Sequence, residues 1–165
     1  MFRNVSELLN ACPGAAELLS APKSDESEKS VEKFVAPFVD IVGWKFIALI
    51  PVLVQSEANI GGKLRSKIAR KVSVKRAVQS VLGPNLEKLV PFAWSYHEGH
   101  ALRIVYTRLG GRGLDAFDNL PRSLKGVQDV LAGALMADDR DPRWQARAEQ
   151  EPGGLVGVRI EIEVL

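Results

Sequence analysis

The segment from Leu120 to Met136 constrains the fold most, because its pattern is the most regular in the chain. Its apolar residues recur at helical spacing and form one stripe, made of Leu120, Leu124, Val127, Leu131 and Leu135. A second pattern, from Val156 to Val164, alternates apolar residues with Arg159, Glu161 and Glu163, as in a strand with one solvated face. A striped helix and a one-faced strand bury their apolar sides against other elements. The two patterns predict an α+β (mixed α/β) fold.

The remaining patterns predict about four strands and two main helices. Strands are expected over residues 45–54, 101–109, 144–150 and 156–164, and the other helix runs from about residue 62 to 82. Pro51 suggests that the first of these strands is an edge strand or has a bulge. Pro152, Gly153 and Gly154 predict an antiparallel hairpin between the last two strands. These elements form a single domain over residues 44–165. Residues 1–43 are expected to be an N-terminal appendage with a polar, flexible linker.

Composition and charge limit the possible classes of protein. The formal net charge is only +2, so the total charge does not by itself indicate nucleic-acid binding. A single cysteine, Cys12, excludes an internal disulfide and fits a reducing compartment. The most apolar stretch, residues 34–54, is interrupted by prolines and charges, which argues against a membrane span. We expect a soluble cytoplasmic protein.

The predicted helix at residues 62–82 is basic. No acidic residue occurs between Glu57 and Glu87. Seven positive side chains lie there: Lys63, Arg65, Lys67, Arg70, Lys71, Lys75 and Arg76. Such a stripe can follow a phosphate backbone. Contact with nucleic acid is therefore favoured over a merely solvated basic face.

Acidic residues cluster on both sides of the helix that begins near Leu120. They are Asp115 and Asp118 before it, Asp129 within it beside Lys125, and Asp138, Asp139 and Asp141 after it. Several of these residues have simpler explanations, since Asp118 or Asn119 could cap the helix and Lys125 could pair with Asp129 on the surface. The carboxylates at the helix C-terminus oppose the helix dipole and repel one another. A bound cation would relieve that conflict, and hard oxygen ligands suit Mg²⁺ or Mn²⁺. A solvated acidic loop, neutralised by arginines, is the alternative.

In their order, these pieces resemble the RusA family of Holliday junction resolvases, and especially its shorter phage-encoded relatives. The resemblance covers about residues 44–165. It comprises an apolar strand, the Ser-Glu-Ala-Asn turn at 56–59, a basic helix, the loop at 115–119, a helix with Lys125 and Asp129, and the pair Asp138-Asp139. It implies a Mg²⁺-dependent homodimeric endonuclease that cuts branched DNA in the bacterial (host) cell. Carried over by position, Asp115, Asp118 and Asp139 would be catalytic metal ligands with Asp138 beside them, and Lys125 would contact a phosphate.

The length of the helix that begins near Leu120 bears on how such a metal site would be assembled. A straight helix from Leu120 to Met136 would be about 25 Å long. Asp118 and Asp139 would then lie near opposite ends of it. An antiparallel pairing of this helix with its copy in a two-fold dimer would bring the two ends together. We therefore expect composite metal sites in a homodimer.

Two other functions remain open from the sequence. The chain could be a catalytically silent nucleic-acid-binding module that uses the basic helix alone. It could instead be a phage structural or assembly protein in which the acidic residues are only solvated.

Overall fold

The structure is a computed structural model that describes residues 33–55, 64–110, 113–114 and 119–165, with the backbone alone for residues 64–67. The chain divides into two compact units, residues 1–31 and 32–165, and the described residues belong to the second unit.

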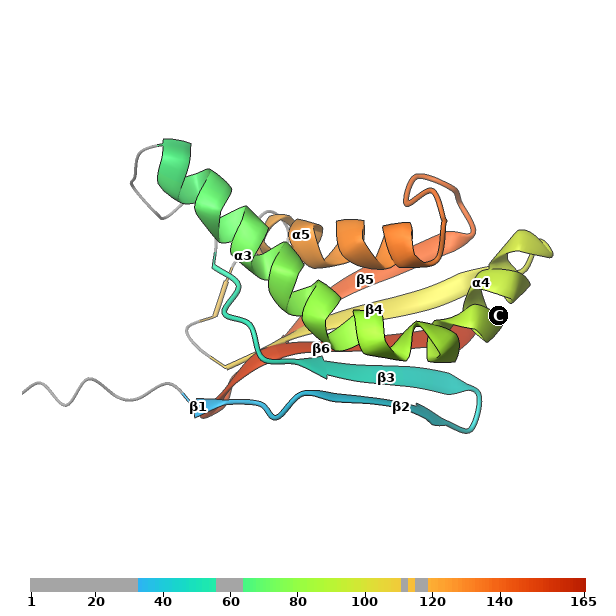
Figure 1. Cartoon of the computed structure of the whole chain (residues 1–165), viewed down its shortest axis with the longest axis horizontal. Coiled ribbons are helices and arrows are strands. Elements are labelled where there is room, and N and C mark those ends of the chain that lie inside the picture. Colours follow the sequence, from blue (N-terminus) through green and yellow to red (C-terminus); the bar gives the residue numbers. More distant parts are fainter. Residues whose placement is uncertain (1–32, 56–63, 111–112, 115–118) are drawn as a thin grey trace, which may run out of the picture. The chain divides into compact units, whose positions relative to one another are not determined.

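A mixed β-sheet forms the centre of this unit (Figure 1). Its strands are β1 (Lys33–Phe34), β2 (Phe38–Val42), β3 (Lys45–Ile50), β4 (Leu102–Leu109), β5 (Trp144–Glu151) and β6 (Leu155–Val164). The order is β2-β3-β6-β4-β5, and β1 pairs with the start of β6. Strands β4 and β5 are parallel, as are β1 and β6, and the other pairs are antiparallel. The α+β class is confirmed, with six strands where about four were expected.

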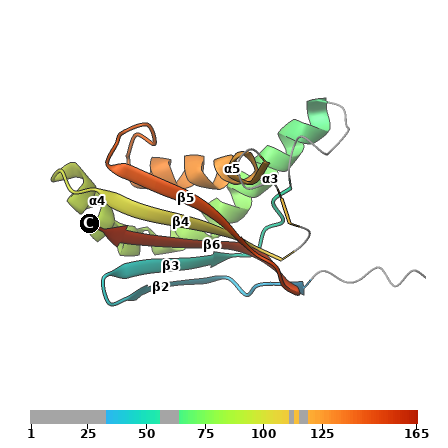
Figure 2. The same cartoon turned by 180° about the vertical axis from the view of Figure 1, so that it is seen from behind.

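Helices cover one face of the sheet, as both views show (Figures 1 and 2). They are α3 (Leu64–Leu82), a 3₁₀ turn at Gly83–Asn85, α4 (Leu86–His97) and α5 (Asn119–Ala134). The predicted stripe of α5 is confirmed, because all five of its residues have exposed fractions of 2% or less. The ring of Phe92 in α4 meets Phe46 of β3 edge-on, with ring centroids 6.0 Å apart. Each described helix is too short or too polar to cross a membrane.

The opposite face of the sheet carries ion pairs between neighbouring strands. Lys45 of β3 and Glu161 of β6 are 3.3 Å apart, and Arg103 of β4 and Glu163 of β6 are 3.1 Å apart. Val158, Ile160 and Ile162 of β6 are fully buried on the helix side. The alternation along β6 therefore separates a core face from a polar face, as the sequence predicts.

The predicted hairpin between the last two strands is wrong. β5 pairs with β4 in parallel, and β6 pairs with β4 from the other side, so that β4 lies between β5 and β6. The reason is that α5 serves as the crossover of a β4-α5-β5 unit, which places β5 parallel to β4. The Pro-Gly-Gly turn at 152–154 then carries the chain past β4.

The predicted domain boundary at residue 43/44 also needs correction. Residues 33–42 form β1 and β2 and belong to the sheet. These strands are short and Pro37 lies between them, so their pattern is not recognisable in the sequence.

β3 is an interior strand that ends at Ile50, because the following Pro51 cannot donate to the ladder. Beyond that point β1 takes over as the neighbour of β6.

Apolar residues recur along the basic helix at mostly helical spacing, as expected for a helix that packs on a core, but only some of them are buried. Val78 and Val81 near its C-terminus are buried, but Ile68 and Val72 have exposed fractions of 53% and 41%. The first half of α3 extends beyond the edge of the sheet and has no core to cover (Figure 1).

Helix α4 lies in a segment for which the sequence predicted no element. Pro91 inside it weakens its helical signal.

Candidate active site

The end of α5 positions the acidic segment that follows it. Met136 adopts a left-handed conformation with φ of 50°. The amide of Met136 donates to Gly133 O at 3.2 Å, and the amide of Ala137 donates to Ala132 O at 2.9 Å. This pair of bonds is a Schellman motif, which ends a helix and reverses the chain. Residues 137–139 therefore turn back along α5.

Because of this reversal, Asp139 lies alongside α5 and not beyond its end. Its carboxylate accepts hydrogen bonds from Lys125 Nζ and from Gln128 Nε2, the latter at 3.2 Å. Along the helix axis, Lys125 is only about 9 Å from Asn119, where α5 begins. Asp139 is therefore nearer to the start of α5 than the length of a straight helix led us to expect. Because Asp118 lies outside the described residues, the composite sites in a dimer stay a prediction. A homodimer itself stays a prediction.

Lys125 links Asp139 to a second carboxylate. Its ammonium lies 3.2 Å from Asp129, and Asp129 lies 3.3 Å from Lys75 of α3. The hydrogen bond to Asp139, followed by the interactions with Asp129, raises the pKa of Lys125. Two carboxylates on one side of α5 thus converge on one cation, and a second lysine from α3 joins them.

Tyr106 of β4 lies under this network. The residue is buried, with an exposed fraction of 2%, and its hydroxyl has no hydrogen-bond partner among the described residues. Burial, with smaller contributions from the charges of Asp139 and Asp129, raises the pKa of the phenol well above its usual value. A buried hydroxyl without a partner costs stability.

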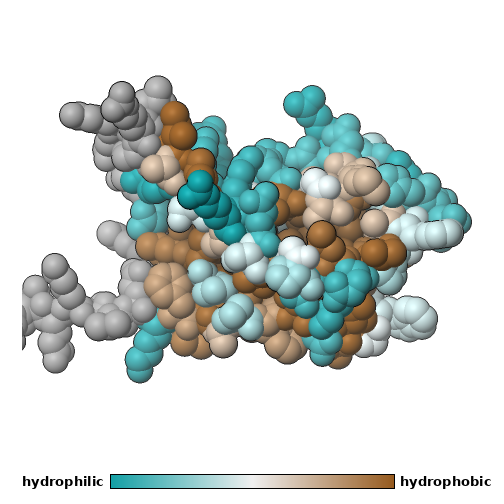
Figure 3. All heavy atoms as spheres, viewed as in Figure 1, coloured by the Kyte–Doolittle hydropathy of each residue, from teal (hydrophilic) through white to brown (hydrophobic). Residues whose placement is uncertain are grey.

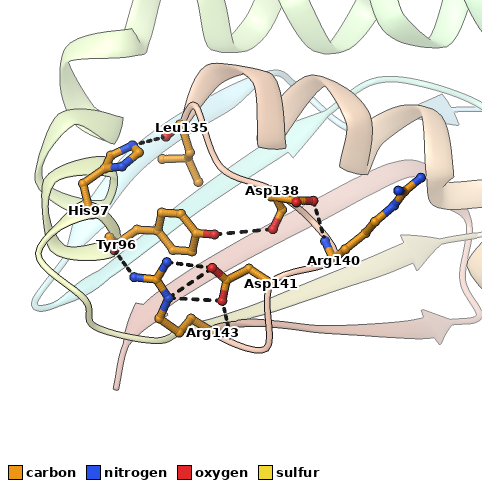
Figure 4. A network of polar contacts seen from close by, with 7 residues as sticks. All are labelled: Tyr96, His97, Leu135, Asp138, Arg140, Asp141 and Arg143. Atoms are coloured by element: carbon orange, nitrogen blue, oxygen red, sulfur yellow. Dashed lines mark hydrogen bonds and ion pairs between the residues drawn. The ribbon is translucent and has the colours of Figure 1, made fainter.

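The other acidic residues of this loop have partners of their own (Figure 4). Asp138 Oδ1 accepts the backbone amide of Arg140 at 3.0 Å. Asp141 is held by the guanidinium of Arg143, whose hydrogen bonds keep the pKa of Asp141 far below its usual range. Arg143 also donates to the carbonyl oxygen of Tyr96 and stacks 4.6 Å from the centre of its ring. The repulsion that suggested a bound cation is therefore relieved by partners within the protein. The Arg143 guanidinium neutralises Asp141, and a backbone amide binds Asp138. Asp139 has Lys125 and Gln128.

A cavity of about 540 Å³ lies beside the network, between α3, α5 and the segment after β3. Five basic residues line it: Arg70, Lys71, Lys75, Arg122 and Lys125. Asp129 is the one acidic residue among the described lining residues. Nη2 of Arg70 is buried and has no hydrogen-bond partner in the described part of the chain. This concentration of positive charge favours an anionic ligand such as phosphate.

The structure brings some of the predicted site residues together and not others. Asp115, Asp118 and Lys63 lie outside the described residues. Arg65 and Lys67 lie on α3, where only the backbone is described, and Arg76 is exposed on α3 but does not line the cavity. Sequence reasoning missed Arg122, Gln128 and Tyr106. The spacing of Arg122, Lys125 and Asp129 along one helix face could have identified the first of these.

The fit to a divalent cation rests on the carboxylates that face Lys125. Within the described ranges, no three acidic, histidine or cysteine residues form a group that could hold a metal ion. Asp139 and Asp129 nevertheless approach one shared cation, the ammonium of Lys125. Mg²⁺ commonly binds through one or two carboxylates with water and substrate oxygens as the other ligands. Asp139 could serve as one such carboxylate, and a Mg²⁺ site that includes it stays a prediction.

Comparison with known proteins does not identify a family. No protein-family model matches the chain, and no curated protein matches it.

Proposed function

We propose that this chain is a Mg²⁺-dependent endonuclease that hydrolyses phosphodiester bonds in branched DNA such as four-way junctions. The observation that carries the proposal is the position of Lys125 at the edge of the basic cavity, with Asp139 and Asp129 in contact with it. Cations that bind phosphate and carboxylates that hold a metal are the two requirements of metal-assisted phosphodiester hydrolysis. Branched DNA lies in the cytoplasm of a bacterial cell, so the proposal includes that location.

The basic side chains bind and orient the DNA strand. The cations of α3 and α5 attract the backbone, and Lys125 contacts the phosphate that is cut. Asp139 and Asp129 hold the Lys125 ammonium before the phosphate arrives, which fixes the position of Lys125. In the reaction, water adds to phosphorus, one bridging P–O bond breaks, and the departing oxygen leaves as a hydroxyl.

The metal would be held by Asp139, with Asp115 and Asp118 as the ligands that the RusA resemblance implies. When bound, Mg²⁺ supplies a Lewis acid for the phosphate and lowers the pKa of a coordinated water. Asp129 also contacts Lys125 and would keep its ammonium directed at the substrate.

A silent nucleic-acid-binding module is the second candidate, and one observation favours it. Asp139 already accepts hydrogen bonds from Lys125 and Gln128, so its charge is neutralised without a metal ion. Such a module would bind DNA through the basic cavity and leave it intact.

The test is incubation with an end-labelled four-way junction and a matching duplex, in Mg²⁺ or in EDTA. Wild type is expected to nick the junction in Mg²⁺ only, and Asp139→Asn to lose this activity. Asp40→Asn is a matched control, because Asp40 pairs with Lys88 at 3.6 Å on β2, outside the cavity. Binding without nicking by wild type, in Mg²⁺ and in Mn²⁺, would establish the silent module instead.

A further inference from the structure

The cavity beside Lys125 is larger and less polar than a phosphate requires. A phosphate backbone can be bound by a row of cations on a surface, with no cavity at all. This cavity, at about 540 Å³, lies within the range of small-molecule sites, roughly 300–1,000 Å³. Its size therefore points to a ligand with a bulky group attached to its phosphate.

The lining of the cavity is divided into a charged part and an apolar part. The basic side chains come from α3 and α5. The apolar residues come mainly from β1 and from the segment after β3, and they are Phe34, Pro51, Val52, Leu53, Val54 and Val74. Figure 3 shows hydrophilic side chains along α3 bordering hydrophobic surface below the helix. Phe34 has an exposed fraction of 48%, so an aromatic ring is accessible at this apolar part.

Arg70 supplies a donor that the protein itself leaves unused. The side chain lines the cavity, and its Nη2 is removed from solvent without an acceptor in the described part of the chain. An unpaired buried donor is unfavourable, so a rotation of the side chain that brings this donor to a ligand acceptor in the cavity would relieve that cost. Arginine forms directed hydrogen bonds with phosphate oxygens and with base carbonyls.

We propose that this cavity binds one unpaired nucleotide of a DNA strand, with its phosphate at Lys125 and Arg122 and its base against Phe34 and the segment after β3. This inference rests on the proposed function and names the form of substrate that the site accepts. At a branch point, nucleotides leave the duplex stack at low cost, so a nucleotide cavity would favour branched DNA over a continuous duplex.

The experiment measures binding in EDTA, where no cleavage occurs, by fluorescence anisotropy of a labelled short oligothymidylate. The comparison ligand is an abasic oligonucleotide of the same length, which has the same phosphates but no bases. Wild type is expected to bind the oligothymidylate about tenfold more tightly or better, the fold-change expected for one base contact. Equal affinity for the two ligands would overturn the proposal.

Two variants locate the binding in the cavity. Ser73 lines the cavity from α3 and is exposed, so Ser73→Trp is expected to fill the cavity without changing the charge. It should abolish the preference for the oligothymidylate and leave the affinity for the abasic ligand unchanged. Ser80→Trp is the matched control, since Ser80 is exposed on the same helix outside the cavity. A preference that survives Ser73→Trp would contradict the proposal.

A second pair of variants tests the role of Arg70. Arg70→Gln is expected to weaken oligothymidylate binding several-fold more than Arg76→Gln, which removes the same charge from the same helix outside the cavity. Equal effects would show that Arg70 acts only through general charge. Competition with thymidine monophosphate separates the two sources of such a ligand. Displacement of the oligonucleotide at monophosphate concentrations below the oligonucleotide's own Kd would assign the cavity to free nucleotides and overturn the strand-binding proposal.

These measurements are independent of cleavage. A base preference in EDTA without junction cutting in Mg²⁺ would support the nucleotide cavity and overturn the nuclease proposal. Junction cutting without a base preference would support the nuclease proposal and overturn the nucleotide cavity.

Discussion

The buried hydroxyl of Tyr106 gives a quantitative test of the network around Asp139. Tyr106 has an exposed fraction of 2%, and its hydroxyl has no hydrogen-bond partner in the described part of the chain. Leaving such a group unpaired costs about 1–3 kcal/mol. Tyr106→Phe keeps the ring and removes only the oxygen, so it trades that cost against a small loss of packing. We expect the free energy of unfolding at neutral pH to rise by about 1 kcal/mol, which for a unit of this size raises Tm by about 4 °C.

The same substitution changes the dependence of stability on pH. The folded-state pKa of Tyr106 is raised by burial and then by Asp139 and Asp129, whereas in the unfolded chain a tyrosine ionises near pH 10 (about the model-peptide value). Ionisation of Tyr106 therefore leaves the free energy of unfolding of wild type unchanged below about pH 10. This free energy falls as the pH rises from there toward the folded-state pKa. Tyr106→Phe lacks this loss, so its advantage over wild type should widen above about pH 10.

Urea unfolding followed by circular dichroism, at neutral pH and above pH 10, measures both effects. The control is Tyr96→Phe, because the other tyrosine donates a long hydrogen bond of 3.4 Å to Asp138 O. That variant is expected to be slightly less stable than wild type at neutral pH. A loss of about 1 kcal/mol or more in Tyr106→Phe would show instead that the hydroxyl has a hydrogen-bond partner in the folded protein.

Other substitutions test the architecture around the site. Gly157→Ala should lower the free energy of unfolding by about 2 kcal/mol or more in the same urea experiment, because the new Cβ would overlap Val35 and lie within 2.8 Å of a β3 carbonyl. Met136→Gly should raise Tm by a few degrees in a thermal scan, since glycine adopts the observed φ of 50° without strain. Asp141→Asn should flatten the loss of stability below about pH 4, because the contact with Arg143 that depresses the pKa of Asp141 in the folded state disappears. An unchanged acid limb in unfolding titrations would argue against that contact.

Local patterns predicted the parts of the fold that depend on one element at a time. The stripe of α5 and the alternation of β6 are each fixed by burial of one face, so both were correct from sequence. The pairing of β5 with β4 was missed, because a turn sequence cannot show that another strand will be inserted between its two neighbours. The exposure of Ile68 and Val72 was missed for a similar reason, since helical spacing does not tell where the sheet beneath the helix ends.

The candidate site shows the same limit. Lys125 and Asp139 were both named as site residues from the sequence, and their roles stay predictions. Their contact depends on the chain reversal at Met136. A left-handed methionine at a helix end has no strong sequence signal, because glycine usually occupies that position. The basic residues were predicted as a stripe on one helix. Their arrangement around a cavity depends on Arg122 and on the segment after β3, which come from other parts of the chain.

A role of Asp139 in metal-dependent phosphodiester cleavage is measured by the single-turnover rate of junction nicking in Mg²⁺. Asp139→Asn is expected to be at least about a hundredfold slower than wild type, the loss expected when metal-assisted charge stabilisation is removed. Its affinity for the junction in EDTA should be unchanged or slightly higher, because the substitution removes a negative charge beside Lys125. Nicking by Asp139→Asn at the wild-type rate would show that the Asp139 carboxylate takes no part in cleavage.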